Sequence, residues 1–426
     1  MTILVFLGAL LGAMALGIPI AYALLVSGMA LMWHINQLDP QILAQNLIEG
    51  ANSFPLLAVP FFLLAGEVMN VGGLSKRIVD FAMALVGHLR GGLGYVTILA
   101  ACLLASLSGS AVADAAALTA LLLPMMVKAG HDKARSAGLI AAGGIIAPII
   151  PPSIGFVIFG VSANVSVTKL FLAGIVPGLL IGAALWITWW WLGRREQQPL
   201  PPRKSAGEIF AALRAASWAL VLPLIILVGL RMGVFTPTEA AVVAAVYALF
   251  VATVIYREMR WRQLLEVFVG AAKTSSVIMF LVAAAMVSSW LITIAQIPAQ
   301  MVTLLKPFMD NPTLLMLAIM LLVMAVGTAM DMTPTILIMT PVLMPVVKAA
   351  GIDPVYFGVL FIINNAIGLI TPPVGTVLNT VAGVGRMKMD EVTRGMLPFM
   401  WAEFAMLFLM VLFPQLVTVP ARWFAS

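Results

Sequence analysis

The sequence predicts an all-α, polytopic membrane protein composed of two inverted repeats. This prediction depends on the composition, on a pattern of prolines that recurs along the chain, and on the distribution of basic residues. Of the 426 residues, 62% are hydrophobic and 9% are charged, whereas a soluble domain has about 25% charged residues. Since one crossing needs about 20 residues, the length allows roughly ten to twelve spanning or half-spanning segments. The composition excludes a soluble enzyme, a disordered chain and a nucleic-acid-binding module.

The sequence offers no transition-metal site and no internal disulfide. Cys102 is the only cysteine, and the three histidines His34, His88 and His131 lie far apart. These spacings match no metal-binding motif, so we expect neither a transition metal nor a cofactor. Residues 1–33 lack the basic leader of a secretory signal, and we expect this segment to remain in the mature protein.

An ungapped shift that places Pro124 on Pro345 aligns the second half of the chain with the first. Of the five prolines between residues 106 and 177, four fall on another proline, although about 0.3 matches are expected by chance. The aligned pairs are Pro124 with Pro345, Gly130 with Gly351, Asp132 with Asp353, Pro151-Pro152 with Pro372-Pro373, Gly174 with Gly395, and Pro177 with Pro398. Prolines that merely mark helix ends would not keep this one alignment, the repeat register, over such a length, so we infer an internal repeat.

Basic residues indicate that the two repeats have opposite orientations. Lys and Arg favour the cytoplasmic side of short loops. The connector 34–52 has no Lys or Arg, while its counterpart 256–272 contains three arginines. A basic, proline-containing linker at 194–214 is expected in the cytoplasm, which leaves both termini on the periplasmic side. Inverted repeats are the architecture of many secondary transporters, whose binding site lies at the repeat interface.

Each repeat is predicted to contain five crossings and one re-entrant hairpin. In the first repeat, 1–193, an interfacial stretch at 35–52 and a hairpin at about 93–127 accompany crossings near 2–16, 18–34, 54–72, 136–163 and 170–193. In the second repeat, 215–426, a hairpin at about 312–347 accompanies crossings near 215–232, 237–256, 274–293, 356–383 and 396–418. The first hairpin is basic at both flanks, so it should turn back instead of crossing. The odd number of crossings then inverts the second repeat.

Four breaks in the helical pattern are predicted at membrane depth. They are the hairpin tips Ser106–Ser110 and Gly327–Asp331 and the Pro-Pro breaks Ile150–Ser153 and Thr371–Gly375. Lipid offers no partner for the unpaired backbone groups of such breaks. Freed carbonyls and hydroxyls suit a small hard cation such as sodium, and half-helix N-termini suit an anion. We predict two related cation sites with an anionic substrate between them; the alternative is that these motifs only permit close helix packing.

Polar side chains near the breaks are candidate contacts. Asp114 and Asp331 are carboxylates in apolar hairpins, where a charge costs several kcal/mol. We therefore expect both near an aqueous cavity, with a capping role as the alternative for Asp114. Asn364 and Asn365 precede the second break and either contact the substrate or form interhelical hydrogen bonds.

Four stretches resemble the large membrane (M) subunit of tripartite ATP-independent periplasmic (TRAP) transporters. They are Val59–Glu67, Ile149–Ile154, Leu170–Gly174 and Gly368–Gly375, and the resemblance covers essentially the whole chain. It implies an elevator-type, sodium-driven importer of small organic acids, in which the hairpins and broken helices form the transport core and the remaining helices form a scaffold. It also implies two partners, a periplasmic substrate-binding (P) protein and a small four-helix membrane (Q) subunit on a separate chain.

The same resemblance implies a sodium site at the tip and break of each repeat. The first site would use Ser106 and Ser108 with carbonyls around Ala147, Ile150 and Pro152. The second would use Gly327, Gly368, Thr371 and the Val374 carbonyl. Ala147 stands where the family commonly has glycine, and Ile150 lacks the hydroxyl of Thr371. The residues assigned to the substrate vicinity are Ser110, Ser153, Asp331, Asn364, Asn365 and Gly375.

The sequence thus predicts a sodium-coupled secondary transporter subunit in the bacterial inner membrane, which imports a small carboxylate delivered by a binding protein. The alternative is a stand-alone sodium-coupled carboxylate carrier that needs no binding protein. We do not expect an enzyme, because the sequence contains no His-Glu-x-x-His motif and no Ser-Lys pair within an apolar segment. A passive channel is disfavoured because inverted repeats with paired hairpins favour alternating access.

Overall fold

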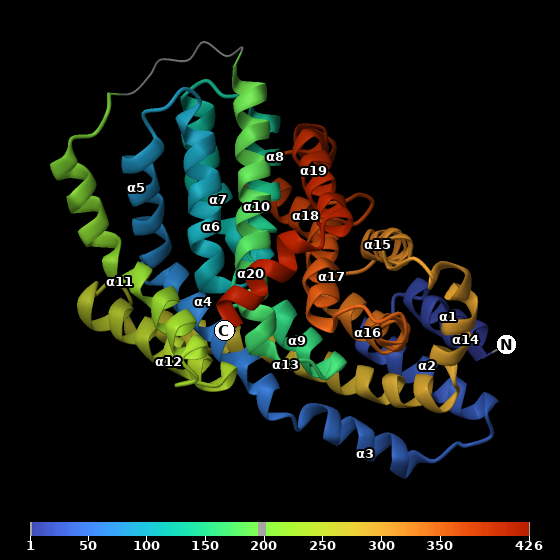
Figure 1. The fold of residues 1–426 in the computed structure, drawn as a ribbon. Coiled ribbons are helices and arrows are strands. Elements are labelled where there is room, and N and C mark those ends of the chain that lie inside the picture. Colours follow the sequence, from blue (N-terminus) through green and yellow to red (C-terminus); the bar gives the residue numbers. More distant parts are fainter. Residues whose placement is uncertain (1, 195–201, 426) are drawn as a thin grey trace.

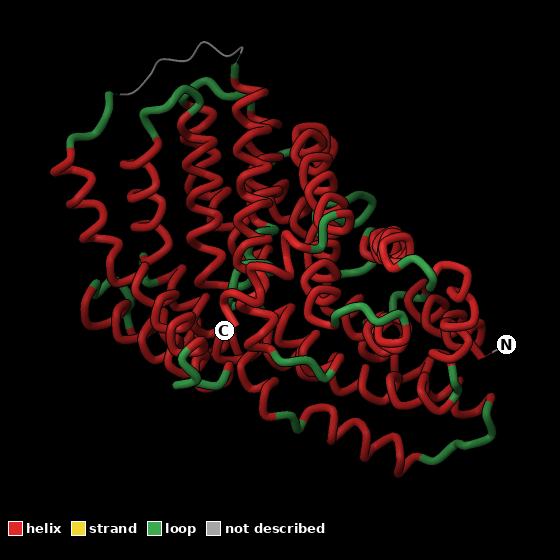
Figure 2. The backbone as a smooth tube through the Cα atoms, in the orientation of Figure 1, coloured by secondary structure: helices red, strands yellow, loops and turns green. Residues whose placement is uncertain are grey.

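The structure is a computed structural model that describes residues 2–194 and 202–425. Figure 2 shows helices joined by short loops, with no strand in these two ranges. Eight of the described helices are long and apolar enough to cross a membrane. The predicted all-α, polytopic membrane fold is confirmed.

The first half of the chain forms mostly helices of moderate length. Those before the first hairpin are α1 (Thr2–Ala15), α2 (Ile20–His34), α3 (Pro40–Ala51), the short 3₁₀ helix η1 (Phe54–Leu57), α4 (Ala58–Val71) and α5 (Leu74–Val86). The hairpin and the helices after it are α6 (Gly92–Ser108), α7 (Ala111–Lys128), α8 (Lys133–Gly144), α9 (Ile154–Ala163) and α10 (Val167–Gly193).

The second half repeats this order with longer helices at its start. These are α11 (Ala206–Arg231), α12 (Pro237–Phe250) with a π-helical end η2 (Val251–Ile255), α13 (Trp261–Ile294), α14 (Ile297–Leu305) and η3 (Lys306–Phe308). The hairpin and the helices after it are α15 (Pro312–Gly327), α16 (Met332–Ala349), α17 (Pro354–Gly368), α18 (Thr376–Gly385), α19 (Met389–Leu412) and α20 (Gln415–Ala425).

Helices α5 and α14 lie where the sequence analysis expected none, and α11 begins earlier than the crossing expected near 215–232. Helix α5 is amphipathic: Leu74, Ile78 and Ala82 are buried at a spacing of four residues, which places them on one face of the helix. Helix α11 begins inside the predicted linker 194–214. The side chains of Ser205 and Glu208 bond each other's backbone amides there, which caps the start of the helix.

The repeat register is also the register of the helices. Helices α7 and α16 have 18 residues each and begin at equivalent positions. Helices α8 and α17 begin after Asp132 and Asp353, and each of these aspartates accepts backbone amides of its helix as an N-cap. The same local chemistry therefore starts the same element in both halves.

The two halves contact each other reciprocally. Helix α7 of the first half packs against α18 of the second, and α16 of the second half packs against α9 of the first. Likewise α8 packs against α19, and α17 against α10. Reciprocal contacts of this kind are those that a two-fold relationship produces. They gather the hairpins and broken helices into one central body, in which Figure 1 shows α8, α18 and α19 side by side.

Glycines permit the closest crossing in this central body, between α8 and α19. A Cβ atom added to Gly395 would lie 1.9 Å from the Ala134 carbonyl oxygen, and one added to Gly138 would lie 2.3 Å from the backbone of Gly395. Only small residues let membrane helices approach so closely. Helix α19 also packs against α10, where the rings of Phe399 and Trp189 stack with their centroids 6.3 Å apart.

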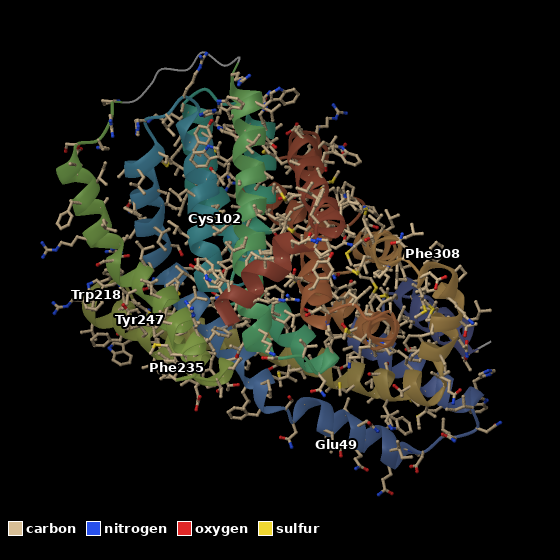
Figure 3. The ribbon with its side chains drawn as sticks, viewed as in Figure 1. Glu49, Cys102, Trp218, Phe235, Tyr247 and Phe308 are labelled. Carbon is tan, nitrogen blue, oxygen red and sulfur yellow. The ribbon has the colours of Figure 1, made fainter. Side chains whose placement is uncertain are left out.

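The remaining helices lie beside and below the central body in Figure 1. At its edge, the Tyr247 hydroxyl of α12 donates to the Trp218 carbonyl of α11 at 2.8 Å, and both residues are marked in Figure 3. Helix α13 contacts α2, α3, α4 and α16, and its 34 residues give a length of about 50 Å. Such a helix is longer than the hydrocarbon core of a bilayer is thick, about 30 Å. Figure 1 shows α13 running across the molecule below α16.

Candidate ion and substrate sites

The first hairpin turns at Gly109, between α6 and α7. Gly109 has a φ of +62°, a conformation that glycine adopts without steric cost. The Ser108 hydroxyl donates to Oδ1 of Asp114, and Ser110 caps α7. Asp114 is 2% exposed, and its Oδ2 has no partner among the described residues. Asp114 is thus held inside the hairpin by Ser108, and Ser110 is the residue that caps α7.

The first break covers residues 145–153, all of which are buried. The Ser153 hydroxyl donates to the Pro148 carbonyl, and its oxygen accepts the Phe156 amide at the start of α9. The hairpin tip presses against this break, because a Cβ atom on Gly109 would lie 2.4 Å from the Pro152 carbonyl oxygen. The structure therefore brings the tip residues Ser108 and Ser110 next to the break at Pro152.

The other residues assigned to the first sodium site are buried or engaged within their own segment. The Ser106 hydroxyl donates to the Leu103 carbonyl at 2.6 Å, which leaves its oxygen lone pairs available to a ligand. Ala147 and Ile150 are 1% and 6% exposed. Only their carbonyls can serve as ligands, since both side chains are apolar.

In the second half, the hairpin tip and the break meet through two glycines. A Cβ atom on Gly368 would lie 2.9 Å from the Gly327 carbonyl oxygen, so the backbones touch. The Thr371 hydroxyl donates to the Ile367 carbonyl at 2.8 Å, and the Val374 carbonyl accepts the Asn379 amide group at 2.8 Å. Carbonyl and hydroxyl oxygens thus gather at this junction, and these are the donors that hard cations prefer.

The two breaks differ in exposure. The whole of the first break is buried, whereas Pro372, Pro373 and Val374 of the second are exposed. Gly375 follows them with a φ of +49° and begins α18. The Thr376 hydroxyl then donates to Oδ1 of Asp331 at 3.3 Å, which joins the start of α18 to the start of α16. In this conformation the second junction is the more accessible one.

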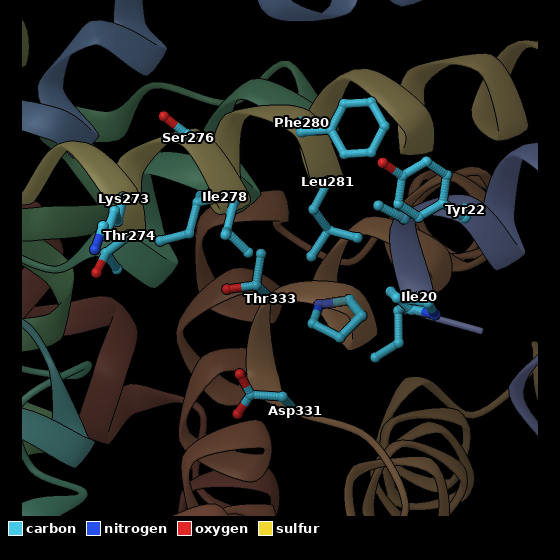
Figure 4. A pocket seen from close by; sticks show the side chains of 14 residues that line it. Ile20, Tyr22, Lys273, Thr274, Ser276, Ile278, Phe280, Leu281, Asp331 and Thr333 are labelled. Atoms are coloured by element: carbon cyan, nitrogen blue, oxygen red, sulfur yellow. The ribbon is translucent and has the colours of Figure 1, made fainter. Parts of the chain in front are cut away.

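A cleft of about 840 Å³ lies between α2, α13 and the start of α16. Figure 4 shows Lys273, Thr274 and Ser276 on the α13 side and Asp331 and Thr333 on the α16 side. The remaining wall is largely apolar, with Ile20, Tyr22, Phe280 and Leu281 among its residues. A largely apolar pocket with a few polar groups and this volume suits a small organic ligand.

Among the residues assigned to the substrate vicinity, Asp331 lines this cleft. Asn364 and Asn365 are each 1% exposed and lie inside the bundle. The Asn364 amide donates to the Met320 carbonyl of α15 at 2.6 Å, and the Asn365 amide donates to the Phe361 carbonyl of its own helix at 2.8 Å. The interhelical hydrogen bond that the sequence analysis weighed for Asn364 is thus present in the structure.

Two charged residues in apolar helices were missed by the sequence analysis. Lys273 lies in the middle of α13 and reaches the cleft, and Glu403 lies in the middle of α19 and is fully buried. Each is an isolated charge within an apolar run, which is an expensive arrangement in a membrane helix. The cost of an isolated charge in an apolar segment could therefore have identified both residues from the sequence.

Sequence comparison relates the chain to a family of membrane transporters. Residues 7–416 match the family described as Tripartite ATP-independent periplasmic transporter, DctM component. The chain is 58% identical over 423 residues to the 2,3-diketo-L-gulonate TRAP transporter large permease protein YiaN of Escherichia coli, covering 99% of this chain and 100% of that protein. It is 39% identical over 405 residues to the sialic acid TRAP transporter large permease protein SiaM of Vibrio cholerae, covering 95% of each.

A solved structure shares the fold at low sequence identity. The Alcanivorax borkumensis YdaH transporter superposes with a TM-score of 0.66 at 14% identity, covering 87% of this chain and 86% of that one. At this identity the match describes the arrangement of helices alone.

We expect Gly109→Ala to unfold at a clearly lower temperature than Gly130→Ala. Both glycines have positive φ, but a Cβ atom has nothing within 4 Å at Gly130 and meets the Pro152 carbonyl at Gly109. The backbone strain of about 1–2 kcal/mol is therefore common to both variants, and only Gly109→Ala adds the clash between tip and break. Thermal unfolding in detergent compares them, and equal melting temperatures would show that the tip does not press on the break.

Proposed function

The chain belongs to the DctM family of tripartite ATP-independent periplasmic transporters, and we propose that it is the large subunit of a sodium-coupled importer of a small organic acid. Members of this family are transporter subunits and not enzymes. The observation that carries the proposal is the contact between a hairpin tip and a helix break in each half of the chain. The two contacts join corresponding segments at different positions. In the repeat register, Gly109 and Pro152 correspond to Met330 and Pro373, whereas Gly327 and Gly368 correspond to Ser106 and Ala147.

The lengths of the helices support a site inside the membrane. The arms of the two hairpins contain 16 to 18 residues, which corresponds to about 24–27 Å. This is less than the thickness of the hydrocarbon core, about 30 Å, so the tips would end within the bilayer. Backbone groups that end there require protein, water or an ion as partner.

Sodium is the proposed coupling ion because of the oxygen atoms at the two junctions. At the first, the hydroxyls of Ser106 and Ser108 accompany carbonyls of the break. At the second, the Thr371 hydroxyl accompanies the Gly327 carbonyl, which lies against Gly368. Neutral oxygens without a surplus of carboxylates suit a monovalent hard cation better than a transition metal.

The proposed substrate site is the cleft between α13 and α16. Lys273 supplies a positive charge for a carboxylate, and the hydroxyls of Thr274, Ser276 and Thr333 supply further hydrogen bonds. Asp331 lies across from them and can accept hydrogen bonds from hydroxyl groups of the substrate. The chemistry fits a hydroxylated organic acid, in agreement with the diketogulonate and sialic acid named for the two relatives.

The cleft also suggests how the subunit moves. One wall belongs to the peripheral helices α2 and α13, and the other belongs to the hairpin helix α16. We propose that the hairpins and broken helices move as one body against this periphery, as an elevator, with two repeats inverted in the inner membrane. A small membrane subunit and a periplasmic binding protein that delivers the acid complete the transporter.

The function is tested in proteoliposomes with 2,3-diketo-L-gulonate as the first probe and sialic acid as the second. Uptake should require the large subunit, the small subunit, a loaded binding protein and an inward sodium gradient. Equal uptake with choline in place of sodium would contradict sodium coupling. Full sodium-driven uptake by this chain alone would establish the stand-alone carrier instead.

We expect Thr371→Ala to raise the sodium concentration for half-maximal uptake roughly three- to tenfold. The variant removes one neutral oxygen, and one such interaction is worth about 0.5–1.5 kcal/mol. Thr371→Ser keeps the hydroxyl and should behave like the parent protein. An unchanged sodium dependence in Thr371→Ala would remove this residue from the site.

We expect Lys273→Gln to raise the KM for the organic acid about tenfold or more, because a hydrogen bond to a charged group is worth about 1.5–3 kcal/mol. Lys273→Arg keeps the charge and should lose less. The measurement is initial uptake at saturating sodium. A KM that changes equally in both variants would indicate a steric role for Lys273 instead of a charge contact.

A further inference from the structure

Glu403 is a carboxyl group in the middle of α19 that has no visible partner. Its residue is 0% exposed. Neither carboxyl oxygen has a hydrogen-bond partner among the described residues. Neither the proposed sodium sites nor the proposed substrate cleft uses this group.

The contacts of α19 place Glu403 beside α17. The Met400 sulfur lies 3.9 Å from the Thr371 hydroxyl at the second break, and the Tyr356 hydroxyl donates to the Met410 carbonyl at 3.1 Å. Helices α17 and α19 therefore run antiparallel between these two contacts. Glu403 is three residues beyond Met400, which places it on the same face of α19.

Helix α17 carries two unpartnered acceptors between these contacts. The side-chain oxygens of Asn364 and Asn365 are buried and bond no donor in the described part of the chain, although both amide NH₂ groups are engaged. An acceptor needs a donor, and an ionised carboxylate cannot supply one. A protonated carboxyl group can.

The first half of the chain has no acid at the equivalent position. In the repeat register, Glu403 corresponds to Gly182 of α10, where a Cβ atom would lie 2.8 Å from the Cys102 sulfur. Packing of the repeat therefore does not require a carboxyl group. The acid belongs to the second half alone, which is also the half with the accessible break.

Other ionisable groups near α19 lie toward the helix ends. The helices that pack against α19 are α8, α10, α15, α17, α18 and α20. Their ionisable residues, together with those of α19 itself, are Lys133, Arg135, Lys169, Tyr356, Arg422, Asp390, Glu391 and Arg394. Gly138 of α8 meets Gly395, while Lys169 and Arg422 line one pocket with Tyr356, which bonds Met410. These groups therefore approach α19 about two turns or more from Glu403.

We propose that Glu403 is a proton-binding site in the central body of the protein. A carboxylate taken out of water without a counter-ion or a donor costs several kcal/mol, whereas the neutral acid is tolerated and can donate one hydrogen bond. The proton comes from water and forms an O–H bond at one carboxyl oxygen. When it is released to water, the ionised group destabilises the packing of α19 on α17 beside the second break. This proposal goes beyond sodium coupling and does not depend on it.

Infrared spectroscopy of the full-length protein in nanodiscs tests the proton directly. At pH 7 the wild-type spectrum should contain the C=O band of a protonated carboxylic acid that is missing from Glu403→Gln. The matched control is Glu391→Gln, which alters an exposed glutamate in the first turn of the same helix and should keep the band. If the spectrum of Glu403→Gln retains the full band, Glu403 is ionised and the proposal is wrong.

Thermal unfolding provides the second measurement. As the pH rises, ionisation of Glu403 should lower the melting temperature of the wild type and of Glu391→Gln by several degrees relative to Glu403→Gln, because glutamine cannot ionise. If Glu403→Gln does not fold, Glu403→Met serves as an uncharged variant of similar volume. Parallel pH profiles in all proteins overturn the proposal. So does a stabilisation of the wild type by NaCl or KCl that Glu403→Gln lacks, which would identify a bound cation in place of the proton.

Discussion

Backbone groups that interrupt a helix inside an apolar bundle must find partners, and this requirement governs the centre of the structure. In each half of the chain, the hairpin tip satisfies this requirement by contacting the segment at the helix break. Gly109 lies against the Pro152 carbonyl, and Gly368 lies against the Gly327 carbonyl. A Cβ atom would lie 2.4 Å from the facing carbonyl oxygen at Gly109 and 2.9 Å from it at Gly368, so glycine keeps each tip in contact with its partner segment.

The two halves use this arrangement differently. The first junction is closed, and its carboxylate Asp114 is bonded by Ser108. The second junction has an exposed Pro-Pro segment, and Thr376 links it to Asp331 at the wall of the cleft. The two halves thus provide similar scaffolds that carry different side chains at equivalent positions. Glu403 opposite Gly182 is a further substitution of this kind.

Much of the candidate site follows from sequence because its signals are local. Proline removes an amide donor wherever it stands, so the breaks beside Pro151 and Pro372 are evident from the residues themselves. The cleft is different, since Lys273 and Asp331 lie far apart in the chain and meet only because α13 passes beside α16. The role of Asn364 also could not be decided from the sequence. The structure shows that its amide donates to the Met320 carbonyl of α15 inside the bundle.

The sequence by itself determined the all-helical membrane fold and the breaks at the two Pro-Pro pairs, since apolar runs and prolines act on their own neighbourhood. Only the tertiary structure decided which tip meets which break, that one junction is closed and the other exposed, and that Glu403 has no partner among the described residues. Those properties depend on contacts between helices far apart in the chain. No local pattern specifies them, because the free energy of burying a polar group is set by what the other helices place around it.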